Sequence, residues 1–174
     1  MDCRNFLITK NDVIKYCGLT ANANDDTINV CIQQAHNRLK SIICEAMLDE
    51  LISEFLADTY TGMNNTFIQD YAQPFLTWLA YSKYIVWGAQ DNTKAGFREL
   101  TDDHSTPVSD ARLKNMLTVA ENEAEINRKI MIRFLFDNIA SFPLFEASDC
   151  YDCCNEKKYF HKVSGAGYYN QDYE

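Results

Sequence analysis

The segment DDTINVCIQQAHNRLKSIICEA, residues 25–46, decides the fold because it is the clearest amphipathic helix in the chain. Its apolar residues recur at intervals of four, three, four, three and four positions, the spacing of one stripe on an α-helix. Asp25-Asp26-Thr27 at its start predicts a helix cap and favourable charges at the helix N-terminus. The segment therefore predicts a long helix with one buried face, formed by Ile28, Ile32, Ala35, Leu39, Ile42 and Ala46.

The apolar pattern changes register after Ala46. If the phase continued, Asp49 and Glu50 would point into the core, whereas the apolar side chains are those of Leu48, Leu51, Ile52 and Phe55. This change predicts a kink or a helix break near residues 41–45. The following helical segment is expected to end at residues 60–65, where a glycine and a pair of asparagines interrupt the pattern.

Helical patterns also lie on both sides of this region. Upstream, Thr9 and Asp12 have the spacing of a capping box, and Gly18 supplies a stop for a short first helix. Downstream, a helix is predicted over residues 66–88, with a kink or a true start at Pro74. The longest helix is predicted from residue 110 to about 140, with Ser109 as its cap and Pro143 as its end; its apolar stripe is Leu113, Leu117, Ala120, Ala124, Met131 and Leu135.

The composition favours helices joined by few loops. The 174 residues include only 6 glycines and 3 prolines, and 47% of them are hydrophobic, which is enough for one sizeable core. We expect an all-α bundle of about four to five helices over residues 1–145, followed by an extended tail over residues 146–174. Within residues 91–107 we expect a protruding loop or a short hairpin formed by residues 96–101 and 104–109.

Charge and cysteine content narrow the class of protein. The formal net charge is −9, and the basic residues are scattered, so a tight nucleic-acid binder is not expected. The N-terminus does not resemble a signal peptide, and no apolar stretch is long enough to span a membrane. Seven cysteines, an odd number, favour free thiols in a protein that is made in a cytoplasm.

The sequence carries no motif of a known catalytic site. It lacks a glycine-rich phosphate loop, a Gly-x-Ser-x-Gly elbow and a His-Glu-x-x-His helix, so we do not expect an enzyme, although a site assembled in space remains open as an alternative. His36 lies on the apolar side of its helix and is expected to be half-buried and structural. His104 is expected in a solvated loop.

The tail contains two sets of residues with binding potential. One set has the residue types of a zinc site, which makes a small zinc-binding regulatory protein the alternative function; it consists of Cys150, Cys153, Cys154 and His161. Because structural zinc sites generally show two separated ligand pairs, the leading expectation is no cofactor and no metal. The other set is aromatic and suits docking on another protein, against the alternative of a tail without a binding role; it consists of Tyr151, Tyr159, Phe160, Tyr168 and Tyr169.

Residues 5–145 resemble the head–tail connector, or adaptor, proteins of tailed bacteriophages. The resemblance rests on Phe6-Leu7-Ile8-Thr9-x-x-Asp12-Val13, then Asp25-Asp26, then Ile28-x-x-x-Ile32-x-x-Ala35-x-x-x-Leu39-x-x-Ile42. Two later motifs are similar to a variant from phages of Bacteroides, including the crAss-like group: Pro74-Phe75-x-x-Trp78-Leu79-Ala80 and Asp137-Asn138-x-x-x-Phe142-Pro143. One departure is Cys44, which stands about where many relatives have a glycine between the second and third helices.

The resemblance implies a structural virion protein without catalytic activity. Such subunits form a ring, typically of twelve copies, that joins the portal protein to other neck or tail proteins and extends the DNA channel. The chain would be assembled in the host bacterial cytoplasm, and DNA would pass through the ring without specific binding. Residues of the expected loop, Phe97, Arg98, Glu99, Leu100 and His104, would contact a neighbouring subunit or face the channel, and the aromatic tail would dock on the portal or a neck protein.

Overall fold

The computed structural model describes residues 6–19, 23–59, 62–90, 98–101 and 104–154 of the chain. This part of the chain is a helical bundle with one short β-hairpin, so the expected all-α class is confirmed. The elements in chain order are α1 (Lys10–Cys17), α2 (Asp25–Ile43), α3 (Glu45–Leu56), α4 (Gly62–Thr66), the π-helix η1 (Phe67–Ala72), α5 (Gln73–Gln90), β1 (Arg98–Thr101), β2 (His104–Pro107), α6 (Asp110–Asp137), the 3-10 helix η2 (Ile139–Ser141), α7 (Pro143–Glu146) and α8 (Asp149–Cys154).

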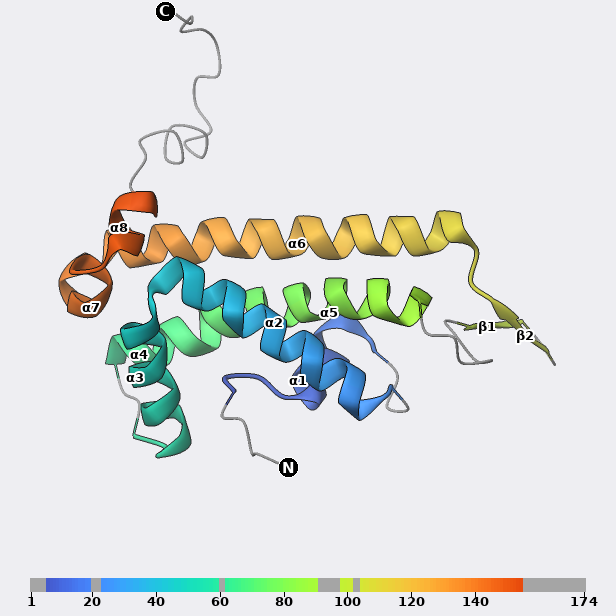
Figure 1. Ribbon diagram of the computed structural model, residues 1–174, viewed down its shortest axis with the longest axis horizontal. Coiled ribbons are helices and arrows are strands. Elements are labelled where there is room, and N and C mark those ends of the chain that lie inside the picture. The colour runs from blue at the N-terminus through green and yellow to red at the C-terminus, as the bar shows by residue number, and fades with distance from the viewer. Residues whose placement is uncertain (1–5, 20–22, 60–61, 91–97, 102–103, 155–174) are drawn as a thin grey trace, which may run out of the picture.

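The central element is α5, which contacts α1, α2 and α6. Apolar residues surround this helix on several sides, and its only charged residue is Lys83, so burial by several neighbours is what its sequence requires. The long helix α6 runs beside α5 (Figure 1). The hairpin lies at one end of the bundle, and α7 and α8 lie at the opposite end (Figure 1).

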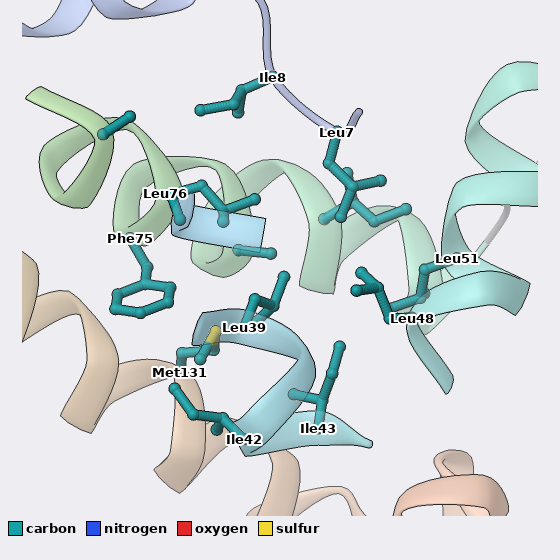
Figure 2. Close-up of a cluster of buried hydrophobic side chains, with 14 of the residues drawn as sticks. Leu7, Ile8, Leu39, Ile42, Ile43, Leu48, Leu51, Phe75, Leu76 and Met131 are labelled. Atoms are coloured by element: carbon teal, nitrogen blue, oxygen red, sulfur yellow. The ribbon is translucent and has the colours of Figure 1, made fainter. Parts of the chain in front are cut away.

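One hydrophobic core joins the N-terminal segment to α1, α2, α3, η1, α5, α6 and α7. Leu7 and Ile8 are 0% and 2% exposed, although they precede the first helix. Figure 2 shows their side chains beside those of α2, α3 and α5, with one methionine from α6 completing the cluster. The labelled members of this cluster are Leu7, Ile8, Leu39, Ile42, Ile43, Leu48, Leu51, Phe75, Leu76 and Met131. The stripe predicted for residues 25–46 faces this core from Ile28 to Ile42, but its last member, Ala46, lies beyond the helix break and is exposed.

The ends of the first helix are as predicted. The Asp12 carboxylate accepts hydrogen bonds from the backbone N–H and the hydroxyl of Thr9, at 2.7 and 2.8 Å. Gly18 ends α1 with a φ of 67°, a conformation that glycine adopts without strain. Both features follow directly from the local sequence.

The cap of α2 differs from the prediction. The Asn24 side-chain oxygen accepts from the N–H groups of Asp26 and Thr27, at 2.9 and 3.1 Å, so Asn24 is the N-cap. Asp25 and Asp26 lie inside the first turn, where their charges still complement the helix dipole. The cap falls one residue earlier because Asn24 already has the extended backbone that a capping residue needs.

The predicted break after α2 is confirmed at a single residue. Cys44 has φ 69° and ψ 161°, and the next helix starts at Glu45. Almost only glycine adopts this backbone conformation, because a β-carbon is too close to the neighbouring backbone there. The backbone at Cys44 is therefore strained. The end of the next segment was predicted wrongly, because α3 ends at Leu56 and residues 62–66 are already helical rather than loop.

Pro74 is the second residue of α5, so the predicted start near this proline is confirmed, although α5 continues directly from helical residues before it. Residues 62–90 form one helical run, and the six residues before Gln73 are π-helical. In this turn the Gln73 N–H donates to the carbonyl of Ile68, five residues earlier. In a π-helical turn a carbonyl accepts from the N–H five residues later instead of four. The hydrogen bond that Pro74 cannot donate therefore disrupts the backbone less here than inside a regular α-helix.

The C-terminal part also departs from expectation. Ser109 caps α6 as predicted, with its hydroxyl 3.4 Å from the Arg112 N–H, but α6 already ends at Asp137. Pro143 instead starts the short helix α7, since the first position of a helix requires no N–H donor. The helical part of the chain then continues through α8, past the boundary expected at residue 145.

Candidate interaction surfaces

The inner face of α6 packs against α5 and the core. Ala120, Ala124, Met131 and Leu135 are at most 4% exposed, which confirms this part of the predicted stripe. The two remaining stripe residues, in the first turns of α6, are only partly buried. The inner face is therefore the one that attaches α6 to the bundle.

A second, mostly apolar stripe runs along another side of α6. We call it the outer stripe, and it consists of Val119, Glu123, Ile126 and Ile130, spaced four, three and four positions apart. Its apolar members are 47%, 49% and 50% exposed. This surface was not predicted, because only one apolar stripe was assigned to the helix. The spacing of Val119, Ile126 and Ile130 could have indicated a second apolar face.

The expected hairpin is present. Strands β1 and β2 are antiparallel, with Arg98 opposite Pro107 and Thr101 opposite His104. Three of the five residues predicted to contact neighbours, Arg98, Glu99 and Leu100, therefore lie in β1, and the fourth, His104, begins β2 rather than lying in a loop. The fifth, Phe97, lies outside the described residues. The hairpin extends from the end of the bundle at the first turn of α6 (Figure 1).

The first residues of the predicted tail are attached to the bundle. The Tyr151 ring lies 5.3 Å from the Phe136 ring and 5.9 Å from the Phe145 ring, measured between centroids. Tyr151 is thus half-buried within its own chain. The other residues predicted to dock on a partner, Tyr159, Phe160, Tyr168 and Tyr169, lie outside the described residues.

The junction of α2 with α8 forms an open hollow of about 590 Å³. Its walls include two cysteines, and each thiol donates to a backbone carbonyl: Cys44 to Leu144 at 3.6 Å and Cys150 to Ser41 at 3.7 Å. The ammonium group of Lys40 pairs with Glu45 at the same place. Each of these two thiols is thus held beside a backbone carbonyl of a neighbouring segment.

The predicted zinc ligands fall only partly within the described part of the chain. Cys150 lines the hollow. The side chains of Cys153 and Cys154 and the whole of His161 do not belong to the described part of the chain. Among the side chains that are described, no group of three His, Cys, Asp or Glu residues could hold a metal ion. Likewise, no helix in this part of the chain has the length and apolar character needed to cross a bilayer.

His36 has a structural role, and it is buried more completely than predicted. Its Nε2 accepts from the Leu7 N–H at 2.9 Å, and its Nδ1 lies 2.9 Å from the Ile32 carbonyl. Since Nε2 is an acceptor, the proton of the neutral ring is on Nδ1. Burial lowers the pKa of His36 to about 4, against a smaller opposing effect of the Ile32 hydrogen bond. The Gln73 amide donates to the Leu7 carbonyl at 2.8 Å, so the backbone N–H and the backbone carbonyl of Leu7 both have a hydrogen-bond partner.

The thiols of Cys17, which is half-buried, and Cys31, which is buried, are unreactive near neutral pH. Burial raises the pKa of the Cys17 thiol to about 12 and that of the Cys31 thiol to about 11, the latter despite the nearby charge of Lys83. Thiols with such pKa values are not nucleophiles near neutral pH. The outer stripe, the hairpin and the α8 end are three candidate binding surfaces of the described part of the chain.

Comparison with known proteins places the chain in a family. No curated protein and no solved structure matches it. Residues 39–155, more than half of the chain, match a family of unknown function, DUF6712. The match extends from the second half of α2 through the last described helix and so includes α5, the hairpin and α6. The chain therefore belongs to the DUF6712 family.

Proposed function

We propose that this chain is a structural subunit of a ring that joins the portal of a tailed-phage capsid to the neck or tail. In this role the ring extends the DNA channel, and the chain carries out no chemical reaction. The subunit would be made in the bacterial cytoplasm and would end in the virion. Its partners would be further copies of itself, the portal protein and other neck proteins.

The outer stripe of α6 is the observation that carries this proposal. Three β-branched apolar side chains aligned along α6, each about half exposed, are costly to keep in water, and a different face of the same helix already attaches it to the bundle. A helix with two apolar faces is expected where a second protein covers the outer one. Subunits of a ring need such surfaces because each copy contacts two neighbours.

Two further features suit a neck ring. The net charge of −9 disfavours adhesion to DNA, which must slide through the channel. The hairpin extends from one end of the bundle and α8 lies at the other, so that contacts at both ends are available to neighbouring rings (Figure 1).

Cryo-electron microscopy of purified virions tests the proposal. The expected result is a ring of copies around the channel below the portal vertex, with the described helices fitting its density. Mass spectrometry of the same particles should detect the chain in a constant ratio to the portal protein. If the chain is absent from virions and remains a monomer in the lysate, the proposal is wrong.

A further inference from the structure

A second exposed apolar surface lies near the end of α5. We call it the α5 end patch, and it consists of Lys83, Val86 and Trp87, which share one side of the helix because they are three and four positions apart. Val86 is 38% exposed and Trp87 is 46% exposed. Tryptophan is the residue most enriched among energetically dominant contacts of protein interfaces, so this patch is suited to anchor a partner.

We propose that the α5 end patch of one copy docks on the outer stripe of a second copy. The inference rests on the proposed ring, since it names the two surfaces that meet at each subunit junction. The contact is assigned to two copies because Val119, Ile126, Ile130 and Trp87 are all about half exposed within one chain. Two different surfaces that pair head to tail build a ring when the rotation between copies closes.

Charge complementarity identifies a second copy as the occupant. Lys83 is the only charged residue of α5, and it lies one turn before Val86 and Trp87. On α6, Glu123 lies between Val119 and Ile126 within the outer stripe. Each surface thus combines apolar side chains with one charge, and the two charges are opposite in sign. Since two copies with a net charge of −9 repel each other overall, a local pair of this kind is needed to orient them.

Self-association of the full-length chain provides the first test. Sedimentation velocity over a range of concentrations up to about 1 mM covers even weak contacts. We expect Trp87→Ala to weaken association by about 30-fold or more, the loss typical of an interface hot spot. Tyr16→Ala is the matched control, since Tyr16 is an aromatic residue that is 44% exposed on α1 and should leave association unchanged. A wild-type chain that stays monomeric throughout contradicts the inference.

A charge exchange tests whether the two surfaces meet. Lys83→Glu and Glu123→Lys should each weaken association, and the double variant should recover most of it, because every junction then again contains one residue of each sign. Lys83 is exposed and Glu123 is half-buried, and circular dichroism will confirm that each variant keeps its helices. A double variant that associates no better than the single variants overturns the pairing.

Mixing two defective variants tests the head-to-tail arrangement. Trp87→Ala lacks the patch, and Ile126→Gln with Ile130→Gln lacks the stripe, so each variant alone should stay monomeric. Mixed together they should form only a one-to-one complex, through the single intact junction. If this complex forms but virions lack the chain, the proposed function fails and the contact stands. If rings in virions meet through other surfaces, the contact fails and the function stands.

Discussion

Replacing Cys44 by glycine should stabilise the protein. Cys44 joins α2 to α3 with φ 69° and ψ 161°, in a region that is open to glycine and nearly closed to other residues. Its thiol makes one long hydrogen bond to the Leu144 carbonyl, at 3.6 Å, and is only half-buried. The side chain therefore contributes little that could offset the backbone strain.

The size of the effect follows from two opposing terms. Relief of the strain is worth about 1–3 kcal/mol. A new glycine also makes the unfolded chain more flexible, which costs about 0.5–1 kcal/mol. Cys44→Ala loses the same thiol but keeps the β-carbon, so it serves as the reference. Cys44→Gly should exceed Cys44→Ala by about 1–2 kcal/mol in the free energy of unfolding, or by about 2–8 °C in melting temperature.

Urea unfolding followed by far-ultraviolet circular dichroism measures this difference, with a reductant present because the chain has seven cysteines. Asp58 provides a matched control, since its φ of 52° is also positive and aspartate tolerates the left-handed region. Asp58→Gly should therefore give a smaller gain than Cys44→Gly. If Cys44→Gly is no more stable than Cys44→Ala, the strain at this junction does not exist and the reasoning is refuted.

Three further results are expected. The pKa of His36 in the folded protein, about 4, lies below its unfolded value of about 6.5. The free energy of unfolding should therefore fall by about 3 kcal/mol as the pH decreases from 6.5 to 4. In urea unfolding at several pH values, His36→Gln should lack this part of the pH dependence. Removing residues 148–174 should lower the melting temperature by more than removing residues 155–174 alone, because only the longer deletion removes the Tyr151 ring contacts. A thiol reagent at neutral pH should label Cys17 and Cys31 only upon unfolding, and rapid labelling of either in the native state would contradict their burial.

Local signals in the sequence were sufficient for much of the fold. The Thr9–Asp12 spacing, the stop at Gly18 and the shift in apolar register near Cys44 each concern residues within a few positions of one another. Such features depend on hydrogen bonds and sterics inside one turn, and for that reason they could be predicted without knowledge of the tertiary structure.

Features that depend on distant parts of the chain were missed. The π-helical turn before Pro74 keeps the helical run continuous. Within this turn the Tyr71 ring packs against Phe134 of α6, and the Phe67 ring packs against Phe142, beyond the end of α6. Tyr151 was expected on a free tail, but its packing partners lie in α6 and α7. No local pattern contains these contacts.

The candidate interaction surfaces were predicted unevenly. The hairpin could be predicted, because scarce apolar residues indicate a segment that leaves the core. The outer stripe and the α5 end patch could not, because exposed Val, Ile and Trp residues are indistinguishable in sequence from buried ones until the neighbours of their helix are known.

The attachment of Leu7 has a consequence for synthesis on the ribosome. The two side chains that bind its peptide group are those of His36 and Gln73, which follow 29 and 66 residues later. At about 5–20 residues per second, Gln73 is made roughly 3–13 seconds after Leu7. During this interval the N-terminal segment lacks the part of the chain against which it packs, so its apolar residues remain accessible to chaperones. The first described residues of the nascent chain are thus among the last to reach their native places.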